Sequence, residues 1–374
     1  MNETRATANA ANAAHTTNAA TGTARTADGV LDEALQRLHA SGPERLGRLT
    51  NHGPMAVEAL VRGGRADTVH RWLDYYRHKL EDMPARVSPV TGADWREALG
   101  DPRRAADWID FFSRALAERP WREVLAAWWP VLLPGIAGGS THPVIRVGHA
   151  VRALIGPGGV ESAPRLAELA HGLGYWAARH APLPPRAPVA LAPAAGAADA
   201  LAAVERIPHQ DGSLPARFAQ LASVPVWPAG PAAGLGPEAA RDRLADLVGA
   251  AVHRFADHGH GEPIMLVHAA TAPNAVLRAL PALPRELWPA SLDAAWAASA
   301  AVTAAYAPAA PAPPEQTRTA RADAATSTFD EVFARAAAHG DDHTIKFADT
   351  ALDVGDERAR AAALRGVELN PPAL

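Results

Sequence analysis

The sequence predicts an all-α protein with a single large helical domain. Apolar residues recur at helical spacing through most of the chain, as in "GVLDEALQRLHA", residues 29–40. Alternating stretches rich in β-branched residues, which are typical of strands, are almost absent. No solenoid repeat period stands out, and no linker clearly divides residues 29–374. We therefore expect one helical domain over residues 29–374, with a buried histidine-lined cavity.

The expected helices follow one another closely. Gly63 and Gly64 end the second of them, and Pro143 suits the first turn of the helix that contains it. Helical periodicity covers residues 29–40, 54–64, 66–81, 107–120, 120–135, 141–156, 163–182, 197–207, 214–222, 237–259, 263–280, 291–307, 327–340 and 341–355. Pro- and Ala-rich stretches at 182–200, 225–237 and 307–327 are expected to be loops.

Residues 1–28 differ from the rest of the chain in composition. They are rich in Ala, Thr and Asn and lack the apolar and basic regions of a signal peptide. Such a segment cannot bury enough apolar surface to fold alone, so we expect a disordered N-terminal tail.

Composition excludes several classes of function. The 374 residues carry a formal net charge of −4, so there is no basic excess for a nucleic-acid partner. The absence of cysteine excludes disulfides, iron–sulfur clusters and thiolate nucleophiles, and favours a reducing, cytoplasmic location. No apolar run reaches the roughly 20 residues of a membrane span. The oligomeric state is left open.

Common cofactor and catalytic motifs are missing. No G-x-G-x-x-G follows a predicted strand, and there is no Walker loop, H-E-x-x-H or G-x-S-x-G. The Gly-rich "GIAGGST" could bind an anion at the start of the next helix, but we interpret it as the turn from which that helix starts.

Seven of the 16 histidines are expected to be solvated, because they sit among polar or turn residues. This group comprises His39, His70, His78, His171, His180, His209 and His339. The segment "HRFADHGHG", residues 253–261, could hold a local metal, but its glycines favour a solvated helix end.

Four histidines lie in apolar surroundings on separate predicted helices. His52 and His142 come near helix starts, His268 is in the middle of an apolar segment, and His343 is near Lys346. One such residue is most often a core histidine, but four together indicate a metal site between helices. His149 follows His142 by seven residues, about 10 Å along the axis, so we expect it to line the pocket instead.

Lys346 is one of only two lysines among 36 Lys and Arg residues. It could form a surface ion pair with Asp342 or Asp349. Alternatively, its amine is needed in a form that arginine cannot provide.

Several segments, in order along the chain, resemble the questin oxidase family. They are "LTNHGPMAVEAL", "WREVLAAWWPVLLPG", "THPVIRVGHAVRAL", "IMLVHAATAPNAVLRALPAL" and "DDHTIKFADTALD", and the similarity spans about residues 30–365. The resemblance implies a helical enzyme that oxidises a ring of an anthraquinone-like or other aromatic polyketide, as a mono- or dioxygenase. It further implies a mononuclear non-haem iron, held at the positions of His52, His142, His268, His343 and Lys346.

The resemblance also implies that the lysine is carboxylated, which would explain why arginine does not serve. A lysine ammonium has no acceptor atom, but burial frees the amine, and its carbamate presents oxygen as a carboxylate does. Fungal members tend to carry a second histidine where this chain has Arg146. We expect Arg146 and His149 to act catalytically by orienting a phenolate. Aromatic candidates for the pocket wall are Trp108, Trp121, Trp128, Trp129, Tyr175 and Trp176, although core packing is the simpler explanation for most.

The expected partners are a small aromatic substrate and O2, with Fe(II) as cofactor and NADPH as a possible reductant. Two alternatives stay open. One is an NADPH-dependent Baeyer–Villiger-type monooxygenase without a metal, for which no nucleotide site is visible in the sequence. The other is a helical binding protein without catalysis.

Overall fold

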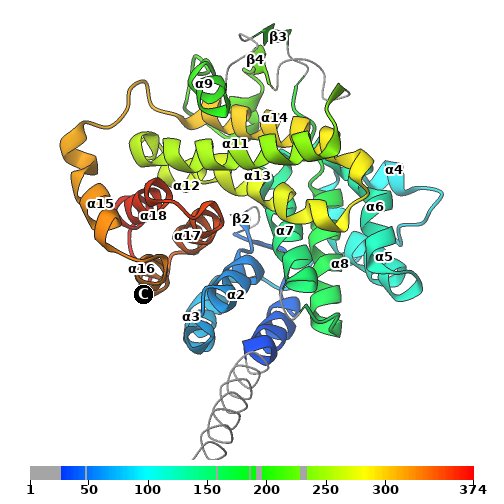
Figure 1. Cartoon of the computed structure of the whole chain (residues 1–374). Coiled ribbons are helices and arrows are strands. Elements are labelled where there is room, and N and C mark those ends of the chain that lie inside the picture. The colour runs from blue at the N-terminus through cyan, green and yellow to red at the C-terminus, as the bar shows by residue number, and fades with distance from the viewer. Residues whose placement is uncertain (1–26, 47–48, 157–158, 185–186, 191–195, 228–233) are drawn as a thin grey trace, which may run out of the picture.

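The computed structural model confirms the all-α fold (Figure 1). It describes residues 27–46, 49–156, 159–184, 187–190, 196–227 and 234–374. Most of the predicted N-terminal tail therefore lies outside the described residues, while residues 27–39 are helical. The named helices are α2 (Gly53–Arg62), α3 (Val69–Tyr76), α4 (Trp95–Ala98), α5 (Ala105–Glu118), α6 (Trp121–Leu132), α7 (His142–Ile155), α8 (Ala163–Ala178), α9 (Ala197–Ala202), α10 (Leu214–Phe218), α11 (Pro237–His258), α12 (Pro263–Leu266), α13 (His268–Ala279), α14 (Trp288–Tyr306), α15 (Pro314–Thr326), α16 (Phe329–His339), α17 (Asp342–Val354) and α18 (Glu357–Leu369).

Strands are few and short. Among the described residues, β1 (Glu44–Arg45) pairs antiparallel with β2 (Leu49–Thr50), and β3 (Ala187–Ala190) pairs in parallel with β4 (Ser223–Val226). The first pair leads directly into His52, so it lies beside the candidate site.

Besides the single-turn α4 (Trp95–Ala98), two helices were not expected from the sequence. The predicted loop 307–327 contains α15, which is polar around most of its circumference and buries only Thr317, Ala320 and Ala324. A helix without a wide apolar stripe gives no periodic signal in the sequence. In the structure, α15 packs on α18. The second missed helix, α18, begins after Gly355, which ends α17 in a left-handed conformation with φ 80°.

The predicted helix over residues 263–280 is broken at Val267, which caps α13. His268 is therefore the first residue of α13 rather than a residue in mid-helix. Pro273 interrupts the α13 hydrogen bonds because it cannot donate to the carbonyl of Ala269. The Ser299 hydroxyl donates to that carbonyl at 2.7 Å, so the oxygen does not stay unpaired.

Four helices form a closed ring at the centre of the molecule. α2 contacts α7, α7 contacts α13, α13 contacts α17, and α17 contacts α2. Each begins at or next to one of four histidines that lie close together, so their N-terminal ends meet at one place. Figure 1 shows α5, α6 and α8 on one side of this ring and α15, α16 and α18 on the other, with α11 and α14 across it.

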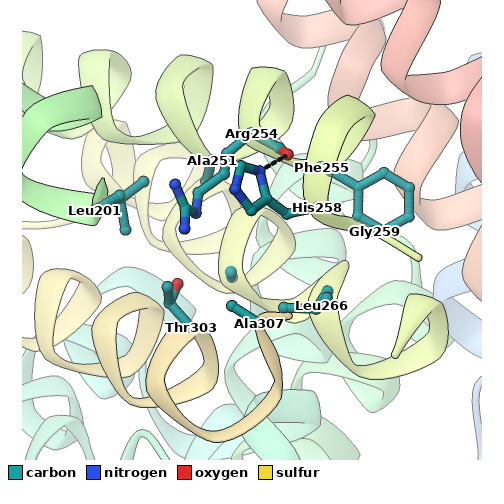
Figure 2. Close-up of a pocket in the computed structure, with 10 residues that line it drawn as sticks. Leu201, Ala251, Arg254, Phe255, His258, Gly259, Leu266, Thr303 and Ala307 are labelled. Atoms are coloured by element: carbon teal, nitrogen blue, oxygen red, sulfur yellow. Dashed lines mark hydrogen bonds between the residues drawn. The ribbon is translucent and has the colours of Figure 1, made fainter. Parts of the chain in front are cut away.

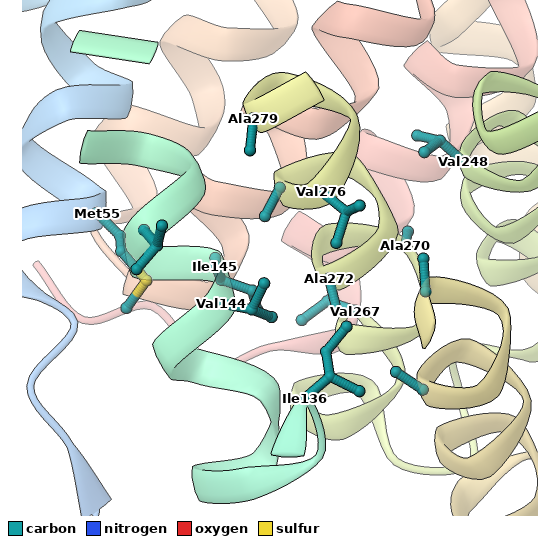
Figure 3. Packing of buried hydrophobic residues seen from close by; sticks show 14 of the residues in the cluster. Met55, Ile136, Val144, Ile145, Val248, Val267, Ala270, Ala272, Val276 and Ala279 are labelled. Carbon is teal, nitrogen blue, oxygen red and sulfur yellow. The ribbon is translucent and has the colours of Figure 1, made fainter. Parts of the chain in front are cut away.

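Small side chains let the ring helices approach closely. Figure 3 shows the packed apolar residues at the contact of α7 and α13, among them Val144, Ile145 and Val276. At Gly148 of α7, an added Cβ would lie 2.6 Å from the Cα of Ala275 in α13. The separation between these two helices is therefore set by the absence of a side chain at Gly148.

No helix in the described part of the chain is both long and apolar enough to cross a lipid bilayer.

Replacing Gly148 by alanine tests this packing. Because the new methyl group would meet the backbone of α13, we expect Gly148→Ala to lower the free energy of unfolding by about 1–3 kcal/mol. The matched control is Gly249→Ala in α11, where the nearest atom to an added Cβ is 4.0 Å away. Because alanine has a higher helix propensity than glycine, Gly249→Ala should raise the free energy of unfolding by up to about 1 kcal/mol. Thermal melting followed by circular dichroism compares the two variants, and equal melting temperatures would contradict the packing argument.

Candidate metal centre

The four predicted histidines come together in one buried cluster. Their relative exposures are 3% for His52, 7% for His142, 0% for His268 and 7% for His343. The Nε2 atom of His142 lies 2.7 Å from Nε2 of His52 and 3.0 Å from Nε2 of His268. The ring of His343 lies 4.6 Å from that of His52, between centroids. The four-histidine cluster is thus built from residues at the starts of four helices.

The backbone before His142 has an unusual conformation. Gly139, Ser140 and Thr141 all have positive φ, of 53°, 56° and 66°. For Ser140 and Thr141 this left-handed conformation is strained, and such strain is concentrated at functional sites. It brings the Gly139 carbonyl to within 2.7 Å of His142 Nδ1.

That carbonyl determines which nitrogen of His142 faces the cluster. A carbonyl only accepts, so Nδ1 of His142 must carry the hydrogen. In the neutral ring, Nε2 then presents a lone pair to His52 and His268. Burial, followed by the charge of Lys346, lowers the pKa of His142 well below its usual value, so the neutral ring is the stable form.

His52 and His268 are also held neutral. Burial lowers the pKa of each ring, helped mainly by Lys346 at His52 and by His142 at His268. Neutral imidazoles are the form in which histidine binds metal ions.

The spacing of the ring nitrogens suits one shared cation. Two nitrogens each about 2.1 Å from an ion and at right angles are about 3.0 Å apart. The contacts of 2.7 and 3.0 Å are close to this value. One nitrogen from each of His52, His142 and His343 also lies within 4.8 Å of the others.

Several buried polar atoms at the cluster have no hydrogen-bond partner among the described residues. They are His52 Nδ1, His268 Nδ1, Asp342 Oδ1 and Lys346 Nζ, with Thr141 Oγ1 and Thr271 Oγ1 nearby in sequence. Buried polar groups are normally paired, so such a concentration points to a ligand or ion. The residues present therefore fit a divalent metal ion.

Lys346 faces the interior, which contradicts a surface ion pair. Its relative exposure is 1%, and burial lowers the pKa of Lys346 to about 8. Its charge acts on the rings of His52, His142 and His268. The predicted alternative partner Asp349 is bound by arginines instead.

Asp342 is a neighbour of the cluster that the sequence did not single out as a site residue. Its Oδ1 lies 2.7 Å from His343 Nδ1 and 3.5 Å from His52 Nδ1, neither in hydrogen-bond geometry. Burial opposes its ionisation, but His343 and Lys346 outweigh this and lower the pKa of Asp342 below its usual range. The carboxylate supplies negative charge beside the histidines.

Arg146 and His149 are bound to carboxylates on other helices. Arg146 makes a two-pronged ion pair with Glu168 of α8, at 2.5 and 2.8 Å. His149 Nδ1 lies 2.7 Å from Glu58 Oε2 of α2. Their predicted role in orienting a phenolate stays a prediction, and these contacts give both side chains a structural partner.

Two histidines expected to be solvated are largely buried instead. His171 is 9% exposed and stacks on His39 at 4.4 Å between ring centroids. His39 Nε2 in turn lies 2.9 Å from Glu168. No periodic signal identified them, because His39 ends its helix beside a turn and His171 precedes a glycine.

The segment "HRFADHGHG" forms no metal site in the described structure. His253 binds Asp356 at 2.9 Å, and His258 Nδ1 lies 3.3 Å from the Arg254 carbonyl oxygen. These histidines lie at the C-terminal end of α11, the helix end that was favoured from the sequence.

The predicted aromatic wall residues serve mainly as core. Trp108 and Trp128 pack edge to face at 5.6 Å between centroids, and Trp129 and Trp176 at 5.4 Å. Trp129 also lines an apolar groove of about 490 Å³ between α6 and α14. Figure 2 shows a different pocket, near Arg254, His258 and Thr303, whose volume of about 20 Å³ has room for about one water molecule.

Comparison with known proteins identifies part of the chain. A family model described as questin oxidase-like matches residues 49–160. This confirms the resemblance inferred from the sequence, over a segment that contains His52 and His142. His268, His343 and Lys346 lie outside the matched residues, so the structure alone brings them to the questin oxidase-like segment. No curated protein matches the chain.

His171 generates a prediction about pH. Burial, with the charges of Arg146 and His39, lowers the pKa of His171 to about 3, although Glu168 opposes this. The unfolded chain binds a proton near pH 6.5 and the folded chain does not, so stability falls as pH drops below about 6.5. This loss is about 2 kcal/mol at pH 5. His171→Gln should remove it, which urea unfolding at pH 8 and pH 5 would measure. An unchanged difference between the two pH values would contradict a neutral buried His171.

Proposed function

We propose that this protein is a non-haem iron oxidoreductase that uses O2 to oxidise or cleave a ring of an anthraquinone-like or other aromatic polyketide. The observation that carries the proposal is the convergence of four buried imidazoles from four helices. The questin oxidase-like match over residues 49–160 supports the same class of reaction.

His52, His142, His268 and His343 would hold the iron, together with Lys346. The neutral amine of Lys346 can add carbon dioxide with release of a proton, and the resulting carbamate offers an oxygen ligand. Nitrogen and oxygen ligands of this kind suit Fe(II). When bound, iron supplies the activation of O2 that an oxygenase needs.

The protein itself orients the ligands and controls charge. The Gly139 carbonyl directs Nε2 of His142 inward, and Asp342 lies against the Nδ1 atoms of His52 and His343. A partner on the outer nitrogen, such as the Gly139 carbonyl at His142, fixes the tautomer and orientation of a metal-binding histidine. Burial of the four rings keeps bulk water away from the reacting centre.

The groove between α6 and α14 is the described cavity best suited to a flat substrate. It is lined mainly by apolar side chains, including Trp129 and Ile136, and by one acid, Asp293, whose pKa is raised by burial. Ile136 also belongs to the packed apolar cluster that contains Val144, close after His142, and Val267, directly before His268 (Figure 3). The volume of the groove is in the range of small-molecule sites.

The stoichiometry of oxygen insertion distinguishes two forms of the reaction. A dioxygenase places both atoms of O2 in the product and needs no added reductant. A monooxygenase places one atom in the product and needs two electrons, which NADPH could supply. Product analysis with labelled O2, with and without NADPH, separates these forms.

Metal analysis tests the proposal directly. Protein produced with added iron should contain close to one Fe per chain. Because His142 contacts two of the other rings, His142→Ala should retain less than about a tenth of that iron after dialysis. His253→Ala, which removes a histidine bound to Asp356 outside the cluster, should retain it all. Negligible metal in the wild type after iron or zinc supplementation would refute the metal centre and leave the metal-free alternatives.

Lys346→Arg tests the carbamate. Arginine keeps the positive charge but cannot be carboxylated, so we expect the variant to lose iron and activity while its far-ultraviolet circular dichroism stays helical. Lys346→Glu, with a carboxylate on a shorter stem, should recover part of the metal binding. A Lys346→Arg protein that is active and full of iron would exclude lysine as a ligand.

A further inference from the structure

A second polar layer crosses the same four helices, below the histidines. Each ring helix carries a charged residue six to ten positions after its histidine, about 9–15 Å along the axis. These residues are Glu58 on α2, Arg152 on α7, Arg278 on α13, and Asp349 and Asp353 on α17. Arg62, in the last turn of α2, completes this ion-pair layer.

Asp349 lies at the centre of the ion-pair layer. Its relative exposure is 0%, and arginines from three helices donate to it. Arg62 Nη1 is 3.1 Å from Oδ1, while Arg152 Nη2 and Arg278 Nη2 are 2.9 and 2.7 Å from Oδ2. One carboxylate on α17 is therefore bonded to α2, α7 and α13, the three other helices of the histidine cluster.

The ion-pair layer is balanced in charge. Three arginines face three acids, and Asp353 also bonds to Arg62, Arg278 and Asn274. His149 stays neutral, because burial lowers its pKa despite the bond to Glu58. The arginines also suit their positions, since Arg62, Arg152 and Arg278 stand in the last turns of their helices, where positive charge is favourable.

The layer is unsuited to a second metal ion. One ligand atom from each of Glu58, His149 and Asp349 lies within 4.8 Å of the others. However, Arg152 bonds to both carboxylates, and Arg278 lies 3.4 Å from His149 Nε2. Guanidinium groups occupy the position that a cation would take, so the layer has a structural role.

We propose that Asp349 is a positioning residue that holds the four histidines in metal-binding geometry by fixing the relative positions of their helices. The proposal rests on the metal centre described under Proposed function. A helix that turns or slides without this contact would move its histidine, because both residues belong to the same rigid element. Metal affinity falls when the groups that orient ligands are lost.

Asp349→Asn tests the proposal against a matched buried carboxylate. Asp107 of α5 is 2% exposed, accepts from Arg104 and the backbone, and lies outside the ring. Both variants should lose stability, but only Asp349→Asn should weaken Co(II) binding, by about 10–100-fold, with a changed visible spectrum. Asp349→Glu keeps the charge and should recover part of the affinity. Equal Co(II) affinity and spectrum in the Asn variants at both positions would overturn the proposal.

An experiment on the metal-free protein tests the role of Asp349 independently of the proposed function. Diethyl pyrocarbonate should modify the four buried histidines about fivefold faster in Asp349→Asn than in Asp107→Asn, as local opening exposes them. If the wild type binds no metal, the proposed function fails, and these modification rates alone decide the role of Asp349. If Asp349→Asn does not fold, Arg62→Gln and its control Arg104→Gln replace the pair, and equal rates in those two would overturn the proposal.

Discussion

The structure depends on holding four helices side by side in the same direction. α2, α7, α13 and α17 all begin at the histidine cluster, so their dipoles repel one another. The arrangement is stabilised at two levels: Gly148 lets α7 and α13 approach closely, and Asp349 accepts hydrogen bonds from three ring arginines. The cluster itself adds unpaired polar atoms rather than stability.

The convergence of N-terminal ends also affects the chemistry of the cluster. A positive helix end disfavours a protonated imidazole, in the same direction as burial does. Negative charge is favoured there, and Asp342 supplies it within the first turn of α17. The neutral rings of His52, His142 and His268 next to a carboxylate form a suitable surrounding for a divalent cation, because each neutral ring keeps one nitrogen lone pair for the ion.

Much of this architecture was predictable from the sequence, because apolar periodicity marks helices that bury one face. His52, His142, His268 and His343 were recognisable by their apolar neighbours, and Lys346 by its rarity in an arginine-rich chain. The helix α15 was missed because it has almost no apolar stripe. The ion-pair layer was missed because pairing depends on how α2, α7, α13 and α17 meet, and no local pattern specifies that. For the same reason, the burial of His171 was not visible.

The distribution of the ring helices along the chain has a consequence for how the protein assembles. Arg62 and Asp349 are 287 residues apart, and the cluster draws its histidines from almost the same span. Closing so long a loop costs entropy that is recovered only when the last contacts form, so folding should be slow. During synthesis, α2, α7 and α13 emerge before α17, so Arg62, Arg152 and Arg278 lack their shared partner Asp349 until α17 arrives. The set of four histidines is therefore complete only after α17 has docked, which makes the centre a late product of folding.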